Sequence, residues 1–174
     1  MAKLGSFTKN NLDKQGFTNL NDEAKSSYEL PLRFTPAVGT VLIVIGLVLR
    51  APIWLGLMTI VALSGALWPR GMIIDLIYNF GVRWLFHAPA LPSTPKPRQF
   101  SYLISALLLA GSAVSFYRGF PFLGFVLGGF VVIDGTILTT TLWCFGSWYY
   151  RLAFGRIAGA NRQQLQEGVL KKSI

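Results

Sequence analysis

Four long runs of uncharged, mostly apolar residues constrain this chain more than any other feature. They cover residues 34–49, 51–69, 99–117 and 119–150, and only Asp134 interrupts the last of them. About 20 apolar residues cross the hydrocarbon core of a bilayer as a helix, so each run can form one span, although the first three are short and the fourth is long. The chain is 52% hydrophobic and 13% charged, which is unusual for a soluble domain. We therefore predict an all-α integral membrane protein with four transmembrane helices.

Two short breaks join these runs in pairs. Each break, one around Arg50 and one around Arg118, places an Arg near a Pro that cannot continue the preceding helix, and so predicts a tight turn. The two pairs have similar openings, which fits a parallel internal repeat but also fits any two helical hairpins. The predicted parts are a polar extension, a first hairpin, a connecting segment, a second hairpin and a basic tail, at residues 1–31, 32–69, 70–98, 99–150 and 151–174.

The distribution of Lys and Arg predicts the orientation of these hairpins. Of the 16 basic residues, only Arg50 and Arg118 fall in the two turns, and the remaining 14 precede, connect or follow the hairpins. The positive-inside rule therefore places both termini and the central segment in the cytoplasm. The same rule accounts for the net charge of +9, so anionic lipids are predicted partners and nucleic acid is not.

The segment between the hairpins has the pattern of an amphipathic helix. Apolar residues recur at helical spacing, and a polar stripe follows at every fourth position: Asp75, Asn79, Arg83 and His87. We predict a helix over residues 71–87 that lies on the cytoplasmic face of the membrane. The four prolines of residues 88–98 then predict an extended connection. His87 is the only histidine; it can ligate a metal or pigment, but a solvated or capping role is favoured at a helix end.

Asp134 is the one carboxylate inside an apolar run. It lies about 12 residues, roughly 18 Å, from the outer start of its helix, where an ionised group in lipid costs at least about 2.5 kcal/mol. Residues at a similar depth on the other helices are Thr40, Ser64 and Ser105, so we predict a polar layer across the bundle. The spacing of Gly124 and Gly128 allows another helix to approach closely. Asp134 then pins helices or a partner, which we favour, or binds a proton or cation.

No complete catalytic or metal-binding group of residues is found in the sequence. Cys144 is the only cysteine, so neither an intrachain disulfide nor a thiolate cluster can form. We expect this residue to be a small buried side chain. The sequence thus predicts no enzyme activity, requires no cofactor and indicates no soluble substrate.

Three segments resemble a bacterial four-helix integral membrane family of uncharacterised function. They read Leu-Arg-Phe-x-x-x-Val from residue 32, Pro-Arg-Gln-Phe from residue 97 and Leu-Trp-Cys-Phe-Gly-Ser-Trp-Tyr-Tyr-Arg-Leu from residue 142. The resemblance implies a location in the bacterial inner membrane or its invaginations. Family members often carry Cys-x-Gly-Cys in the last helix and can occur beside thioredoxin-like proteins, which implies thiol chemistry. Ser147 stands at the second cysteine position here, and a dithiol cycle needs two sulfurs.

These features together predict a non-catalytic accessory subunit of a larger membrane complex, respiratory or photosynthetic, with the other subunits as partners. The competing predictions are a small independent proton or cation transporter centred on Asp134 and a thiol-redox-linked membrane protein. Residues 1–27 contain few apolar side chains and are not expected to become ordered alone. We therefore expect a partner to supply the surface that orders this extension.

Overall fold

The chain is helical in the computed structural model, which describes residues 5–17, 22–69, 72–86 and 90–154. No strand occurs within these ranges, so the predicted all-α class is confirmed for them. The elements are α1 (Ser6–Gln15), α2 (Asp22–Val48), α3 (Pro52–Leu67), α4 (Ile73–Ile77), the π-helix η1 (Tyr78–Val82), α5 (Arg83–Phe86), α6 (Lys96–Tyr117) and α7 (Pro121–Thr141). Residues 145–154 form a further helical segment, called the final helix below.

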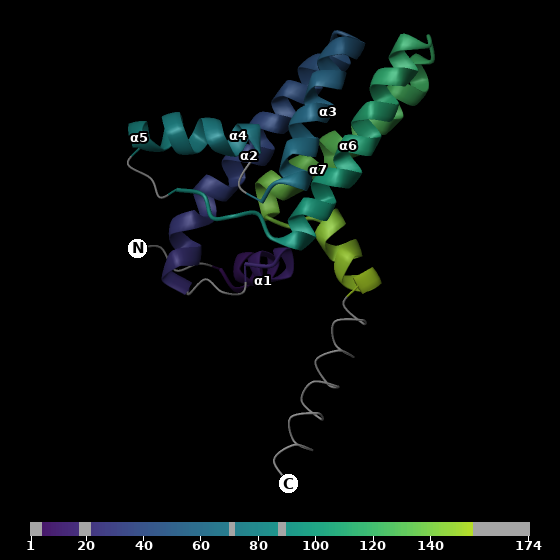
Figure 1. The fold of residues 1–174 in the computed structure, drawn as a ribbon. Coiled ribbons are helices and arrows are strands. Elements are labelled where there is room, and N and C mark those ends of the chain that lie inside the picture. Colours follow the sequence, from purple (N-terminus) through teal and green to yellow (C-terminus); the bar gives the residue numbers. More distant parts are fainter. Residues whose placement is uncertain (1–4, 18–21, 70–71, 87–89, 155–174) are drawn as a thin grey trace.

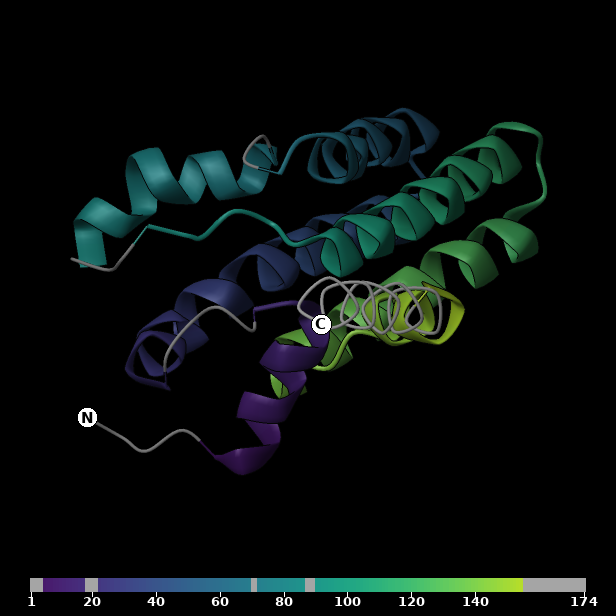
Figure 2. The ribbon, with the colours of Figure 1, turned by 60° about the horizontal axis from the view of Figure 1, so that its bottom comes forward.

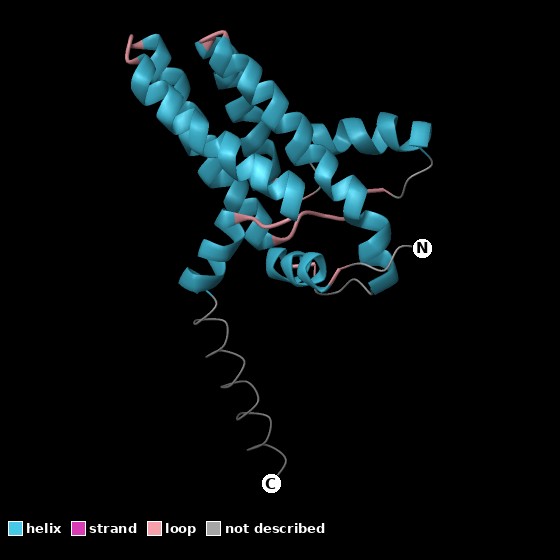
Figure 3. Cartoon of the chain, turned by 180° about the vertical axis from the view of Figure 1, so that it is seen from behind, coloured by secondary structure: helices cyan, strands magenta, loops and turns pink. Residues whose placement is uncertain are grey.

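Four of these helices, α2, α3, α6 and α7, form a bundle. Helix α3 packs on α6, α6 on α7, and α7 on α2 (Figure 1). The α2–α3 turn and the α6–α7 turn lie at the same end of the bundle, as seen from both sides (Figures 1 and 3). Each turn contains one left-handed residue, Arg50 or Gly119, and a proline begins the helix that follows. A proline fits there because the first helical N–H needs no partner within the helix.

Three helical segments are long and apolar enough to cross a membrane. They are Lys25–Val48, Lys96–Tyr117 and Pro121–Thr141, and they indicate a multi-pass membrane protein. Helix α3 is also apolar but has only 16 residues, which span about 24 Å at 1.5 Å per residue. The hydrocarbon core is about 30 Å thick, so the fourth span stays a prediction.

The bundle buries one apolar cluster and leaves much of its outer surface apolar. The buried members are Ile43, Leu47, Leu55, Ala62, Ala106, Leu109 and Val131. Large apolar side chains such as Ile53, Leu107 and Phe122 are exposed on the outside. Lipid tails solvate such side chains as well as a protein core does, so this distribution is the one expected for helices in a bilayer.

Helix α1 lies across the end of the bundle opposite the turns (Figures 1 and 2). Leu12 and Phe17 form a small buried cluster with Leu32 of α2 and Leu142. The side-chain amide of Asn11 donates to the carbonyl of Thr141 at 2.9 Å. The prediction that a partner must order this extension is therefore wrong for its described part, because the chain's own bundle supplies the surface. Helix α2 also begins well before the expected boundary at residue 32.

The prediction of one long helix from residue 119 to residue 150 is wrong. Helix α7 ends at Thr141, Leu142 is left-handed with φ of 52°, and residues 142–144 are not helical. The last carbonyls of α7 accept hydrogen bonds from side chains of distant segments. Arg33 Nη1 donates to the carbonyls of Thr139 and Thr140 at 3.0 and 2.6 Å. These donors satisfy groups that every helix end leaves open.

The segment from α4 through η1 to α5, called the arm below, projects sideways from the bundle (Figure 1). Its helical residues lie inside the predicted 71–87 helix, but a π-helical turn interrupts them. Ile74 and Tyr78 are buried at its attachment, and the Tyr78 ring packs on Phe34 of α2 with 5.2 Å between ring centroids. After the arm, residues 90–95 have no regular secondary structure and lead into α6.

Candidate functional site

A cavity of about 80 Å³ lies inside the bundle, among α2, α3, α6 and α7. Thr40 of α2, Ser105 of α6 and Asp134 of α7 all line it. The structure therefore brings three of the four predicted polar-layer residues to one cavity. Ser64, the fourth, does not line it: its hydroxyl donates to the carbonyl of Val61 at 2.7 Å and accepts the N–H of Ile73 at 3.3 Å.

The polar groups of this cavity are only partly satisfied by the chain. Asp134 Oδ1 accepts the N–H of Phe145 at 3.1 Å. Among the described residues, neither the second carboxylate oxygen nor the hydroxyls of Thr40 and Ser105 have a hydrogen-bond partner. Unpaired polar groups are costly inside a bilayer. The cavity is large enough for a few water molecules, since one water needs roughly 10–15 Å³ of such space.

The bond between Asp134 and Phe145 fixes the path of the chain after α7. Phe145 is the first residue of the final helix, so the carboxylate lies at the positive end of that helix, where a negative charge is favourable. The two residues are eleven positions apart, and a straight helix would separate them by roughly 16 Å. The contact is possible because α7 stops at Thr141 and the chain turns back. Asp134 therefore joins two elements of its own chain.

Glycines allow the helices to approach closely around this cavity. A Cβ at Gly135 would overlap the Thr40 hydroxyl, and one at Gly128 would overlap Leu47, so α7 lies close against α2 at both positions. A Cβ at Gly124 would lie 2.7 Å from the Phe116 ring, and the Gly124 carbonyl accepts the Ser112 hydroxyl of α6 at 2.7 Å. The predicted pair Gly124 and Gly128 is thus placed at helix contacts. The pattern analysis did not single out Gly135.

A second polar cluster lies at the end of the cavity nearest α1, and of its members the sequence analysis singled out only Asp75. The Thr35 hydroxyl donates to Asp75 of the arm. Arg98 is only 4% exposed, and its Nε donates to the Tyr102 hydroxyl at 3.1 Å. Thr35 and Tyr102 line the cavity itself. The sequence could have predicted part of this cluster, because Arg98, Tyr102 and Ser105 of α6 follow the i, i+4, i+7 spacing of one helix face.

The predicted polar stripe of the arm does not behave as a single face. Asp75 accepts from Thr35, and Asn79 Oδ1 accepts the N–H of Leu91 at 2.8 Å, so both contact other parts of the chain. The guanidinium of Arg83 stacks on the neighbouring Trp84 ring, 4.8 Å from its centroid. His87 lies outside the described residues, so its predicted role is not tested.

Cys144 directly precedes the final helix, Ser147 lies in its first turn, and both are buried. Cys144 Sγ lies 2.8 Å from the hydroxyl oxygen of Ser101 on α6, and the Ser147 hydroxyl has no partner among the described residues. Cys144 is thus enclosed, as expected for a small buried side chain. Within the part of the chain that the structure describes, no three His, Cys, Asp or Glu side chains come together as a metal site.

Comparison with known proteins gives one family match. The family model described as a domain of unknown function, DUF4395, matches residues 29–154, which is more than two thirds of the 174 residues. No curated protein and no solved structure matches the chain. The match contains α3, α6, α7, α2 from residue 29 onward, the arm and the Asp134 cavity.

Proposed function

The chain belongs to the DUF4395 family of unknown function, and on that premise we propose from its own residues that it is a non-catalytic accessory subunit of a larger membrane complex. In this proposal all four bundle helices cross the membrane as two hairpins, with both turns outside and both termini in the cytoplasm. The clustering of both turns at one end supports this arrangement (Figure 3). The excess of Lys and Arg in the segments at the other end supports the orientation.

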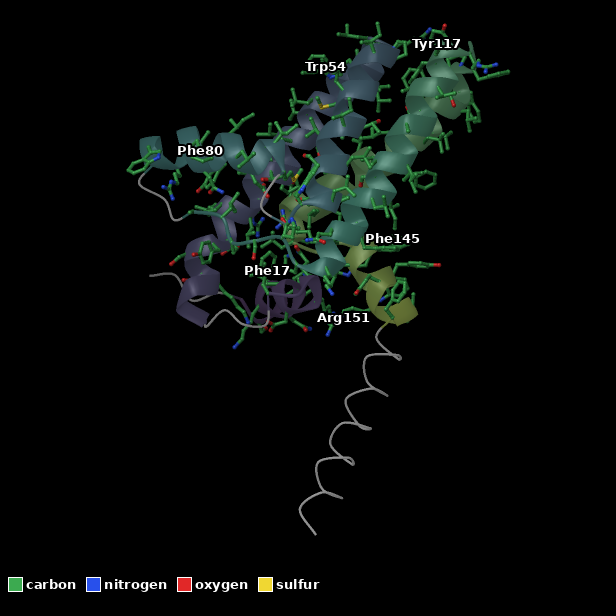
Figure 4. All side chains as sticks on the ribbon, in the orientation of Figure 1. Phe17, Trp54, Phe80, Tyr117, Phe145 and Arg151 are labelled. Carbon is green, nitrogen blue, oxygen red and sulfur yellow. The ribbon has the colours of Figure 1, made fainter. Side chains whose placement is uncertain are left out.

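The arm is the observation that carries the accessory role. It extends beyond the side of its own bundle (Figure 4), and no described part of the chain covers its outer apolar residues. Phe80 is 79% exposed and Trp84 is 68% exposed. Buried contacts of Ile74 and Tyr78 fix the arm to the bundle, so it holds these side chains in a defined position relative to the bundle. In this proposal the arm lies at the membrane surface. A firmly held apolar surface of this kind suits contact with a neighbouring subunit.

Native purification tests this role. We expect the tagged chain, extracted in mild detergent, to migrate with a defined set of membrane proteins that mass spectrometry can identify. The double variant Phe80→Ser/Trp84→Ser should still insert but should lose this association, because its apolar contact surface is removed. The control Phe122→Ser changes an equally exposed side chain at the turn end of the bundle and should retain the association. A wild-type chain that migrates alone or as a homo-oligomer would contradict the proposal.

The cavity supports a second candidate, a small proton or cation transporter. The observation in its favour is Asp134, which lines the cavity and whose second oxygen has no hydrogen-bond partner in the described chain. Against it, the apolar cluster continues beyond the cavity toward the turn end, where Leu47 and Leu55 are buried beside the α2–α3 turn. The buried hydroxyls in this layer, those of Ser112 and Ser115, already donate to the carbonyls of Gly124 and Gly111, so they do not form an open path for an ion, and we therefore rank the accessory role first.

A further inference from the structure

One face of the final helix is apolar and largely exposed. Four of its side chains, each 43–53% exposed, follow the i, i+3, i+4, i+7 spacing of a single helix face: Phe145, Trp148, Tyr149 and Leu152. We call this the outer face. The opposite face packs on the bundle, because Gly146 and Ser147 are buried and a Cβ at Gly146 would lie 2.7 Å from the Cα of Ser101 on α6. The helix is thus held in place while its outer face has no cover in the described chain.

The final helix lies level with the ends of two segments that can cross a membrane. It begins four residues after α7 ends at Thr141. It also packs beside Phe100, the fifth residue of α6, whose ring lies 6.4 Å from the Tyr149 ring and 5.6 Å from the Tyr150 ring, measured between centroids. Both α6 and α7 are apolar and long enough to span a bilayer. The final helix therefore starts where the hydrocarbon core ends.

The outer face continues the apolar outer surface of α7. Phe130 and Ile133 of α7 are exposed, and together with Phe145 and Tyr149 they line one hollow of about 390 Å³ whose surface is almost entirely apolar. The final helix leaves the bundle on the side away from the arm (Figures 1 and 2). Since the exposed side chains of a membrane span contact lipid, the same lipid reaches the outer face without a boundary.

The charges after the outer face suit lipid headgroups. Residues 142–150 carry no charge, and the first charge that follows is the exposed Arg151. From residue 135 to residue 166 the sequence has three arginines and no acidic residue. Trp and Tyr side chains such as Trp148 and Tyr149 are enriched where a membrane meets water, and basic residues beside them attract anionic lipids. The sequence of this segment thus matches a membrane surface better than water.

We propose that the final helix is an interfacial membrane helix, with its outer face among the upper acyl chains and Arg151 at anionic phospholipid headgroups. This position explains why the uncharged run is too long for one span: the 21 residues of α7 cross the bilayer, and the residues after it follow the surface. A neighbouring subunit fits the outer face less well, because that face is continuous with the lipid-facing side of α7. The inference needs only that α6 and α7 cross the membrane, and it is independent of the proposed accessory role.

Spin labelling of the full chain measures the depth of the outer face. A nitroxide is attached at Trp148→Cys or Leu152→Cys, and the chain is reconstituted in vesicles of phosphatidylcholine and phosphatidylglycerol. Collisions with oxygen, which concentrates in the bilayer, are compared with collisions with the water-soluble chelate NiEDDA. We expect both labels to lie roughly 5–10 Å into the headgroup and acyl boundary. The wild type, whose only cysteine is buried, gives the background.

Two exposed positions serve as references. Ile133→Cys on α7 should be open to oxygen and shielded from NiEDDA, and Asn10→Cys on α1 should be open to NiEDDA. Labels on the outer face should resemble the first. NiEDDA access equal to that of Asn10→Cys would place the outer face in water, and weak collisions with both reagents would show that a second copy of the chain covers it. Either result would overturn the proposal.

A matched pair of variants tests the headgroup contact. The label at Leu152→Cys should lie deeper in vesicles that contain phosphatidylglycerol than in phosphatidylcholine alone, because the anionic headgroups attract the basic flank of the helix. Arg151→Gln should reduce this shift. Arg118→Gln removes an exposed cation at the turn end of the bundle and should leave the shift unchanged. Equal shifts in the two variants, or no shift in the parent chain, would contradict the contact between Arg151 and anionic headgroups.

Discussion

Asp134 uses its two carboxylate oxygens in different ways. One oxygen accepts the Phe145 N–H and thereby holds the final helix against α7. The other has no hydrogen-bond partner among the described residues, and Asp134 lines a cavity together with Thr40 and Ser105. The structural role needs only a hydrogen-bond acceptor at this position, whereas proton or cation transport needs a group that changes charge or binds a charge. These requirements can be separated by substitution.

Asp134→Asn should insert and unfold like the wild type, because the amide oxygen can still accept the Phe145 N–H. Asp134→Leu removes the acceptor, and we expect it to lower the free energy of unfolding by about 1–3 kcal/mol. Unfolding in detergent measures this difference. In liposomes with an imposed ion gradient and a pH-sensitive dye, the wild type and the Asn variant should both match empty liposomes. Flux that occurs in the wild type and disappears in Asp134→Asn would contradict the structural role.

Counting residues along the helices predicted that Thr40, Ser105 and Asp134 lie at a similar depth, because every helix rises by the same amount per residue. It failed for Ser64 because α3 is short and ends at Leu67. Ser64 therefore lies in the last turn of α3, where it contacts the first residue of α4. The partner of Asp134 was also beyond reach of the sequence, since the contact depends on where α7 stops.

At the scale of elements, the end of α7 is set by side chains from the N-terminal part of the chain. Arg33 and Asn11 donate to its last carbonyls, and Gln15 Nε2 donates to the Leu142 carbonyl. The uncharged run continues to Tyr150, so composition alone predicted a continuous helix. Likewise, a residue spacing of four predicted one polar stripe on the arm, but η1 has more residues per turn than an α-helix and shifts the positions that follow.

The α7 cap predicts a defined effect of Arg33. Arg33→Leu leaves the carbonyls of Thr139 and Thr140 without this donor, so we expect a loss of about 1–2 kcal/mol in the free energy of unfolding. Hydrogen exchange of the amides at residues 142–145 should also become faster. The control Arg151→Leu removes an exposed cation from the final helix and should leave both measurements unchanged. Equal behaviour of the two variants would show that the cap does not hold this junction.

For the whole molecule, the all-α class and the multi-pass character could be predicted because a bilayer interior satisfies no backbone groups, so long apolar segments must become helices. The position of α1 could not be predicted from the sequence. Of its two large apolar side chains only Leu12 is buried, in one small cluster, whereas Phe7 is exposed, and polar side chains complete the contact with α7. Low average hydrophobicity predicted that residues 1–27 need a partner, but average values do not describe how a few well-placed residues pack.

The number of spans and their direction can be tested together by labelling with a membrane-impermeant maleimide. In intact cells, single cysteines at the exposed turn positions Leu49→Cys and Arg118→Cys should react, whereas Asn10→Cys and Ser93→Cys should react only after lysis. Cys144 adds little background because it is buried. If α3 did not cross the membrane, α6 would start outside, so Ser93→Cys would react in intact cells and Arg118→Cys would be protected. The two arrangements predict opposite labelling at Ser93→Cys and Arg118→Cys, so this pattern decides whether the 16 residues of α3 cross the bilayer. If they do, the bilayer has to thin locally around this short helix.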